Sequence, residues 1–138
     1  MTIQSRTENL RRVREFISDA ARRAGFEDES VQKIALAVDE ACTNIIKHSY
    51  QFAPDKDIEI SVITKDGSFE IIISDHGRSF DPNTIQMPDM KEYMRKYRRG
   101  GLGMYLMRSL MDIVEYETRP GSTNSVRLVK FIPVRTNV

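Results

Sequence analysis

Glu40 and Asn44 stand four positions apart and are the first residues whose types and spacing could do chemistry. Residues four apart on a helix rise from the same face, so a carboxylate and an amide would lie side by side. Such a pair can hold Mg²⁺ and orient a water or a hydroxyl for attack on a phosphate. For a pair of this kind taken alone, a solvated polar surface is the simpler explanation.

A second candidate is the tripeptide Asp75-His76-Gly77, which follows an alternating segment that ends at Ser74. A carboxylate at the end of a strand can accept a hydrogen bond from an exocyclic amine, and glycine lets the backbone pass close to a flat base. Asp and Gly are also common in plain turns, so this signal is weak by itself.

A third candidate is the glycine-rich segment Gly100-Gly101-Leu102-Gly103, which directly precedes a helical apolar pattern. Glycines at a helix N-terminus let phosphate oxygens approach backbone N–H groups that have no intrahelical partner, and the helix dipole favours the anion. Arg98 and Arg99 stand just before the glycines and would add phosphate contacts. A flexible loop ahead of a helix is the alternative, and the segment does not match a P-loop.

Two helices must position the first pair. Apolar residues recur at helical spacing from about 8 to 24, with Gly25 as a stop signal, and again from about 28 to 50. The apolar stripe of the second helix comprises Val31, Ile34, Ala35, Val38, Ala41, Cys42 and Ile45. Glu40 and Asn44 lie away from this stripe on a helical wheel. Cys42 lies on it, so we expect a small core residue there rather than a nucleophile.

An antiparallel hairpin must position Asp75. Alternation of apolar and polar residues predicts strands over about 57–65 and 68–75. Asp66-Gly67 lies between them, and this dipeptide is favoured where both turn residues need a positive φ.

The remaining elements follow the hairpin. No periodicity survives over 81–99, and so long an irregular stretch inside a compact domain is typical of a functional lid. A third helix is expected over about 102–111. Strands are expected over about 114–118 and 126–132, with a turn at 120–122.

This order of elements predicts an α+β fold, a two-layer sandwich with helices on one face of a mixed, mostly antiparallel sheet. With 138 residues, the chain has room for one domain with one hydrophobic core, which we expect to span 1–138. An apolar fraction of 40% beside 30% charged residues is typical of a globular protein rather than a disordered one.

Composition also argues against several classes of function. A net charge of +1 gives no electrostatic case for direct nucleic-acid binding. No apolar run approaches the roughly 18 residues of a membrane span, and the first residues lack the apolar core of a secretory signal. Cys42 is the single cysteine, which excludes an internal disulfide and suits a reducing compartment, so we expect a cytoplasmic protein.

The three candidate segments gain weight from their order and spacing. Glu40-Ala41-Cys42-Thr43-Asn44, Asp75-His76-Gly77-Arg78-Ser79-Phe80 and Arg99-Gly100-Gly101-Leu102-Gly103 resemble the N, G1 and G2 boxes of the GHKL ATPase/kinase superfamily, which has the Bergerat ATP-binding fold. The resemblance is closest to the bacterial anti-sigma-factor serine/threonine kinases of the general stress response. It covers roughly residues 30–132.

The resemblance implies a role for each matching residue. Asn44 would hold Mg²⁺ that bridges the phosphates, and Glu40 would be the general base that activates a serine or threonine hydroxyl on a protein substrate. Asp75 would bind the adenine amino group, and Gly77 would give the base room.

The G2 segment would bind the phosphates of ATP. Gly101, Gly103 and the neighbouring amides of Gly100 and Leu102 would cradle the phosphate oxygens, and Arg99 matches a lid arginine near the γ-phosphate.

The implied partners are a sigma factor, which the protein would sequester, and a small STAS-fold antagonist, which it would phosphorylate. A homodimer is a further implied option.

Two positions depart from the family pattern. The second glycine of the superfamily's D-x-G-x-G is Ser79 here, so the geometry of the adenine pocket can differ. The family's small hydroxyl residue before the last strand has no clean match. Thr123, Asn124 and Ser125 compete for this position, and we favour Ser125.

The sequence therefore predicts an Mg-ATP-dependent protein serine/threonine kinase that also acts as an anti-sigma factor. The alternative is a non-catalytic switch of the same family, which changes partners with ATP or ADP and regulates a protein such as a phosphatase. A carboxylate at Glu40 favours the kinase, because a switch would not need a general base.

Overall fold

Alternating apolar residues build the sheet of this protein. The computed structural model describes residues 1–78, 107–119 and 123–133. Its strands are β1 (Thr2–Gln4), β2 (Asp57–Lys65), β3 (Ser68–Asp75), β4 (Ile113–Thr118) and β5 (Asn124–Phe131). They form one sheet in the order β1-β2-β3-β5-β4, and each of these pairings is antiparallel.

The β2–β3 hairpin has the predicted bounds. Ile60 pairs with Ile73 and Val62 with Ile71, so the apolar residues of both strands share one face. The turn residues Asp66 and Gly67 have φ values of 50° and 79°. Both are positive, as the Asp-Gly signal predicted. The short strand β1 was not predicted, because three residues are too few to establish alternation.

Two long helices follow the predicted apolar stripes. A 3₁₀ helix (Thr7–Asn9) leads into α1 (Leu10–Ala24), and α1 ends at Gly25 with φ 102°, as the stop signal predicted. Helix α2 (Asp28–Asn44) ends earlier than expected, because the chain continues as a π-helical turn over Ile45–Ser49. The predicted helix to residue 50 is thus an α-helix followed by a wider turn.

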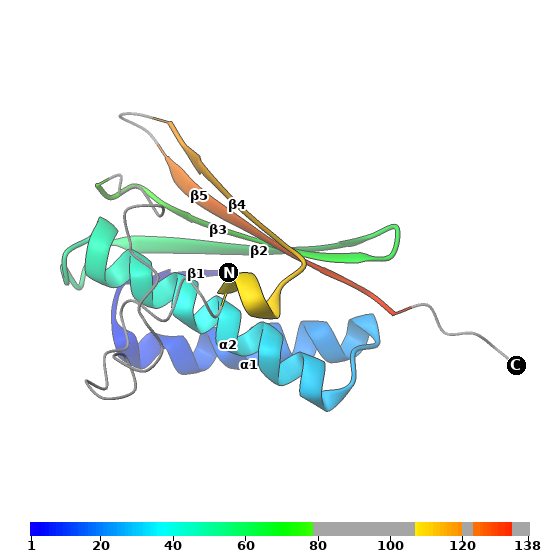
Figure 1. Cartoon of the computed structure of the whole chain (residues 1–138). Coiled ribbons are helices and arrows are strands. Elements are labelled where there is room, and N and C mark those ends of the chain that lie inside the picture. The colour runs from blue at the N-terminus through cyan, green and yellow to red at the C-terminus, as the bar shows by residue number, and fades with distance from the viewer. Residues whose placement is uncertain (79–106, 120–122, 134–138) are drawn as a thin grey trace, which may run out of the picture.

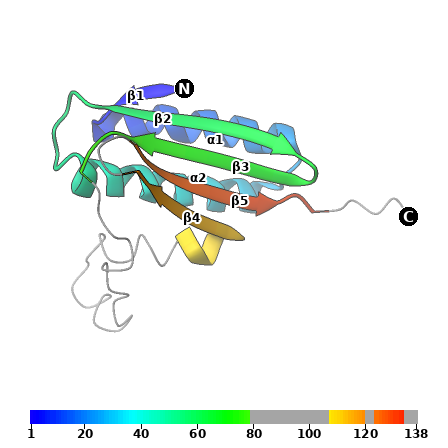
Figure 2. The same cartoon turned by 90° about the horizontal axis from the view of Figure 1, so that it is seen from above.

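Helices α1 and α2 lie side by side on one face of the sheet, whereas no described helix covers the other face, which is termed the open face (Figures 1 and 2). The core between the layers holds Val13 and Ile17 of α1, Ile34 and Val38 of α2, and the inward residues of the strands. Cys42 is fully buried in it, as predicted. The structure confirms the predicted fold class, although all described strand pairs are antiparallel rather than mixed.

The segment before β4 is fastened to β5. Residues 107–110 are helical, which agrees with the end of the predicted third helix. Lys130 Nζ donates to the carbonyl of Leu110 over 2.9 Å, and the Phe131 amide donates to Asp112 Oδ2 over 2.7 Å. These contacts fix the chain where it leaves the helix and enters the sheet.

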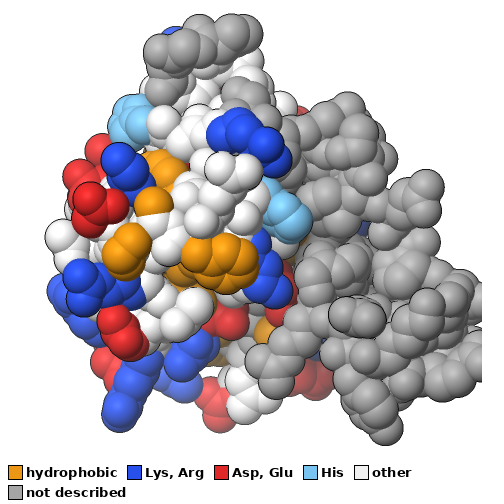
Figure 3. All heavy atoms as spheres, turned by 90° about the vertical axis from the view of Figure 1, so that its left-hand side faces the viewer, with side chains coloured by type: hydrophobic (Ala, Val, Ile, Leu, Met, Phe, Trp, Pro, Cys, Tyr) orange, Lys and Arg blue, Asp and Glu red, His pale blue; other side chains and the backbone are white. Residues whose placement is uncertain are grey.

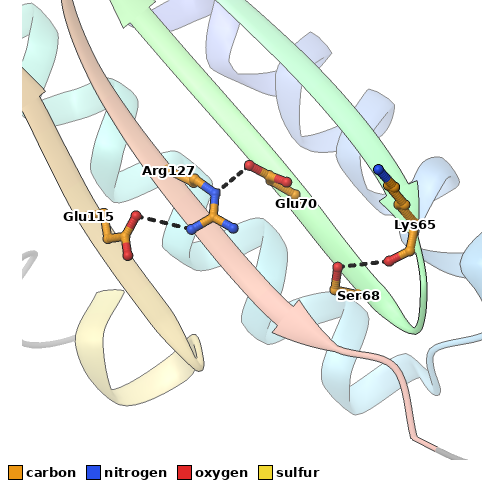
Figure 4. A network of polar contacts seen from close by, with 5 residues as sticks. All are labelled: Lys65, Ser68, Glu70, Glu115 and Arg127. Carbon is orange, nitrogen blue, oxygen red and sulfur yellow. Dashed lines mark hydrogen bonds and ion pairs between the residues drawn. The ribbon is translucent and has the colours of Figure 1, made fainter.

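On the open face, charged residues connect three neighbouring strands. Arg127 of β5 lies between Glu70 of β3 and Glu115 of β4 and pairs with both, over 3.0 Å in the case of Glu115 (Figure 4). These ion pairs place charges on a face that also carries apolar residues such as Ile72 and Val129.

A search of the described helices for a membrane-spanning segment finds none with the required length and apolar character.

Cys42 allows a direct test of how tightly the helix layer packs. Burial, and to a lesser degree the negative charge of Asp39, raises the pKa of the Cys42 thiol to about 12. Only the thiolate reacts readily, so we expect the folded protein to react with a thiol reagent at pH 8 more than about a hundredfold more slowly than the unfolded chain. Comparable rates with and without denaturant would show that α2 does not cover the thiol.

Candidate functional site

Asp75 occupies a position that the core would normally fill with an apolar side chain. The inward positions of β3 are Phe69, Ile71, Ile73 and Asp75, each buried, while the residues between them are partly exposed. Asp75 itself is only 2% exposed. A buried carboxylate requires hydrogen-bond donors or a bound group, because its desolvation is otherwise costly.

Two donors hold one oxygen of this carboxylate. The Gly77 amide donates to Asp75 Oδ1 over 2.9 Å, and Asn124 Nδ2 donates to the same oxygen over 3.0 Å. Asn124 Nδ2 also donates to the carbonyl of Gly77 over 3.0 Å. Within the described part of the chain, both hydrogen bonds to Asp75 therefore end on Oδ1.

Position 77 has no room for a side chain, so only glycine fits there without a shift of its neighbours. A Cβ atom at this position would lie 2.6 Å from the carbonyl oxygen of Ser49 and 2.7 Å from Cδ1 of Tyr50. The next amide, that of Arg78, donates to the same Ser49 carbonyl over 2.8 Å. The close approach of Gly77 to a base stays a prediction, and the structure adds a close contact between Gly77 and the end of the π-helical turn.

Tyr50 adds a second link at this point. Its hydroxyl donates to the carbonyl of Asp57 over 2.5 Å and accepts from the His76 amide over 2.9 Å. Burial is the main cause that raises the pKa of Tyr50, so the hydroxyl keeps its proton and continues to donate at neutral pH. Tyr50 thus connects the end of the π-helical turn with the start of β2 and with the residue that follows β3.

A pocket opens beside Asp75 and encloses about 350 Å³ of empty space, including the part open to solvent. Its walls come from the end of α2 and from β3, β4 and β5, and consist of Ala41, Asn44, Ile45, Ile73, Asp75, Tyr116, Thr118, Asn124, Ser125 and Val126. The pocket brings together Asn44 and Asp75, two residues that the sequence predicted to bind one ligand from different elements.

Asn44 is buried, whereas the alternative of a solvated polar pair would leave it exposed. Only 2% of Asn44 is exposed, while Glu40, one turn earlier on α2, is partly buried. Asn44 lies off the apolar stripe of α2 and borders the pocket. The pair therefore presents a buried amide and a more accessible carboxylate along one helix face.

Strand register separates two of the three candidates for the family's hydroxyl position, Asn124 and Ser125. Asn124 pairs with Asp75 and Thr118, on the inward face, while Ser125 pairs with Ser74 and Glu117 on the open face. Ser125 borders the pocket, yet Asn124 is the residue whose side chain contacts Asp75. Ser125 as a nucleotide ligand stays a prediction, and the structure adds Asn124.

Tyr116 and Thr118 also border the pocket and were not predicted as site residues. Burial raises the pKa of Tyr116 to about 12. The Tyr116 hydroxyl lies 3.9 Å from the sulfur of Met107. The alternation along β4, together with its pairing with β5, could have indicated that Tyr116 and Thr118 face the site.

His48 lies in the π-helical turn and is partly exposed. Burial, then the positive charges of Lys47 and Arg78, lowers its pKa, which favours the neutral imidazole. Figure 3 views the molecule from the end at which β3 ends, and the described part of this face carries basic, acidic, histidine and apolar side chains together.

The remaining predicted ligands lie outside the described residues. These are Arg99, Gly100, Gly101, Leu102 and Gly103. The predicted lid over 81–99 and Ser79, which departs from the family pattern, also lie outside the described residues. Their roles stay predictions.

Comparisons with known proteins show the family to which the chain belongs. The family described as the histidine kinase-like ATPase domain matches residues 3–130. The chain belongs to this family. The predicted membership of the superfamily is thereby confirmed.

Curated relatives cover most of the chain. The serine-protein kinase RsbW of Bacillus pumilus is 35% identical, over 96% of this chain and 84% of the relative. RsbW of Bacillus subtilis strain 168 is 31% identical over the same shares, and that of Listeria monocytogenes strain EGD-e is 35% identical over 84% of this chain and 75% of its own length. Each relative is named a serine-protein kinase, which is the enzyme class that the sequence predicted.

A solved structure supports the fold. The histidine kinase domain of the Erythrobacter litoralis EL346 blue-light activated histidine kinase aligns with a TM-score of 0.56 at 18% identity. The alignment covers 94% of this chain and 62% of that domain.

The contact at Gly77 generates a prediction that a pair of glycine variants can test. Gly77→Ala would press a methyl group against the Ser49 backbone, and we expect a loss of about 1–3 kcal/mol in the free energy of unfolding together with weaker ATP binding. Thermal unfolding and nucleotide titration measure the two effects.

Gly67→Ala is the matched control. Gly67 has open space around it but a positive φ of 79°, so alanine there is strained without any contact near the pocket. We expect lower stability and unchanged ATP affinity. If Gly77→Ala also left ATP affinity unchanged, the contact with Ser49 would have no part in shaping the pocket.

Proposed function

We propose that this chain is an ATP-dependent protein serine/threonine kinase that sequesters a sigma factor and phosphorylates a STAS-fold antagonist of the same pathway. The observation that carries the proposal is a buried carboxylate, Asp75, that lines a pocket also bordered by the amide of Asn44. The relatives named serine-protein kinase support the reaction class.

Asp75 binds the adenine amino group. Its Oδ1 accepts two hydrogen bonds from the protein, which leaves Oδ2 as the acceptor for a ligand. Ile73, Ile45 and Val126 supply apolar walls to the same pocket, and a flat base fits such walls.

Asn44 binds Mg²⁺ through its side-chain oxygen. Among the described residues, no group of three or more His, Cys, Asp or Glu side chains could hold a metal ion. The protein would therefore need the phosphates of the nucleotide to complete the coordination of Mg²⁺. Mg²⁺ in kinases is held by one or two protein oxygens together with phosphate oxygens, so this donor set fits the ion. When bound, the ion neutralises negative charge on the phosphates.

Glu40 is the general base. Its carboxylate lies one turn before Asn44, on the same helix face and partly exposed, where a substrate hydroxyl can reach it. Glu40 takes the proton of a serine hydroxyl as that oxygen bonds to the γ-phosphorus, and the bond to the β–γ bridging oxygen breaks to release ADP.

The G2 segment completes the phosphate site. The amides of Gly100, Gly101, Leu102 and Gly103 cradle the phosphate oxygens, Arg99 contacts the γ-phosphate, and 81–99 forms a lid over the nucleotide. The order of the motifs along the chain supports this part of the proposal. The whole chain acts as one ATP-binding domain, with the cytoplasm as its location and a homodimer as one option for its assembly.

Removal of Glu40 tests the catalytic role. We expect Glu40→Ala to bind Mg-ATP like the wild type and to lose phosphate transfer by at least about a hundredfold, because general-base catalysis contributes that much. Transfer of label from γ-labelled ATP to a small protein in a lysate, with Mg²⁺ present or chelated, measures the reaction.

The neighbouring carboxylate provides a matched control. Asp39 pairs with Arg14 of α1 over 2.7 Å, and Asp39→Ala should keep transfer close to that of the wild type. An active Glu40→Ala would remove Glu40 from the catalytic role. If the wild type bound ATP and labelled no protein, the alternative of a non-catalytic nucleotide switch would replace the kinase.

Removal of Asn44 tests the metal site. We expect Asn44→Ala to weaken ATP binding by about tenfold or more in the presence of Mg²⁺ and to have little effect when Mg²⁺ is chelated. Titration calorimetry with and without Mg²⁺ measures both affinities, and circular dichroism checks the fold. Equal losses under both conditions would argue for a structural role of Asn44 instead.

A further inference from the structure

Asn124 is placed to control the carboxylate of Asp75. The two residues are partners in the β3–β5 register, and the strands lie side by side (Figure 2). Both side chains border the pocket. Asn124 thus faces the same ligand site as Asp75 from the neighbouring strand.

A single nitrogen of Asn124 serves two acceptors. Nδ2 donates to Asp75 Oδ1 and to the carbonyl of Gly77, each over 3.0 Å. An amide nitrogen carries two hydrogens, so it can satisfy both acceptors at once. The reverse orientation would set the amide oxygen against two acceptors, so chemistry fixes which end of the amide faces Asp75.

The contacts form a closed group. The Gly77 amide donates to Asp75 Oδ1 while the Gly77 carbonyl accepts from Asn124. The carboxylate and the peptide that follows it are therefore held together as one unit. A carboxylate held by two donors on one oxygen keeps its second oxygen in a fixed direction.

A fixed oxygen that only accepts hydrogen bonds, in the lining of a pocket, selects for a ligand that donates. A 6-aminopurine offers an N–H to this oxygen, whereas a 6-oxopurine sets a lone pair against it. Sites built to satisfy one hydrogen bond reject analogues that lack it, because the buried polar group is left unpaired.

The side-chain type matters for this role. The family resemblance implies a small hydroxyl residue near this position, and a hydroxyl has one hydrogen to donate. An asparagine has two, and both are used here. An asparagine at position 124 therefore provides a second hydrogen bond that a serine or threonine in the same place could not supply.

We propose that Asn124 is a positioning residue that makes the pocket selective for a 6-aminopurine nucleotide, acting through Asp75 and Gly77. The inference rests on the proposed function in so far as the pocket beside Asp75 is the ATP site.

The test compares two nucleotides that differ at one position of the base. Affinities for ATP and for inosine triphosphate, which carries a 6-oxo group, are measured by titration calorimetry with Mg²⁺. The wild type should prefer ATP. Asn124→Ala should lower that preference by about tenfold, through weaker ATP binding and little change for inosine triphosphate.

Two further variants separate selectivity from general damage. Asn124→Thr keeps one donor, so its preference for ATP over inosine triphosphate should lie between those of the wild type and Asn124→Ala. If Asn124→Ala does not fold, the preference of Asn124→Thr alone tests the role of Asn124. Ser74→Ala is the control, since Ser74 precedes Asp75 on β3 but lies on the open face. Its preference for ATP should equal that of the wild type.

The outcomes distinguish this inference from the proposed function. A wild type that binds neither nucleotide would overturn the ATP site itself. A wild type that binds ATP without preference, or an Asn124→Thr variant with unchanged preference, would overturn the role of Asn124 and leave ATP binding standing. The same loss of preference in Ser74→Ala would show a loosened strand rather than a specific tether.

Discussion

Burial of the Asp75 carboxylate is the constraint on which the site depends. Strand β3 delivers this charge to the core face because its alternation continues without a break from Ile73. Desolvation would make such a position unfavourable without donors. The donors come from the turn that follows β3 and from the neighbouring strand, so the sheet has to bring Gly77 and Asn124 to the same oxygen.

The same constraint links the site to the helix layer. The Gly77 amide that donates to Asp75 belongs to a stretch of backbone that also lies against Ser49, at the end of the π-helical turn. That turn continues directly from α2, which carries Glu40 and Asn44. The residues proposed to act on phosphates and those proposed to bind the base are therefore parts of one packed unit.

Much of this arrangement could be predicted from the sequence. Alternation and the Asp66-Gly67 turn were sufficient for the β2–β3 hairpin, because both signals are local and mutually consistent. The spacing of Glu40 and Asn44 predicted a shared helix face. Asp75 was predicted at a strand end, and the structure adds that it is buried there.

Other features depend on long-range contacts that a local pattern does not contain. Choosing between Asn124 and Ser125 requires the register of β5, and a shift of one residue exchanges the two faces. The π-helical turn was missed because helical periodicity does not distinguish it from a continuing α-helix over so few residues. The pairing of β1 with β2 joins segments more than fifty residues apart in the chain.

The order of the strands also bears on solubility during expression and storage. The sheet of the described strands has β1 at one edge and β4 at the other. Exposed edges can pair with another copy and nucleate aggregates, and proteins counter this with very short edge strands or with charges. Strand β1 has three residues, and β4 carries the exposed carboxylates Glu115 and Glu117. Both edges thus discourage the growth of intermolecular sheets.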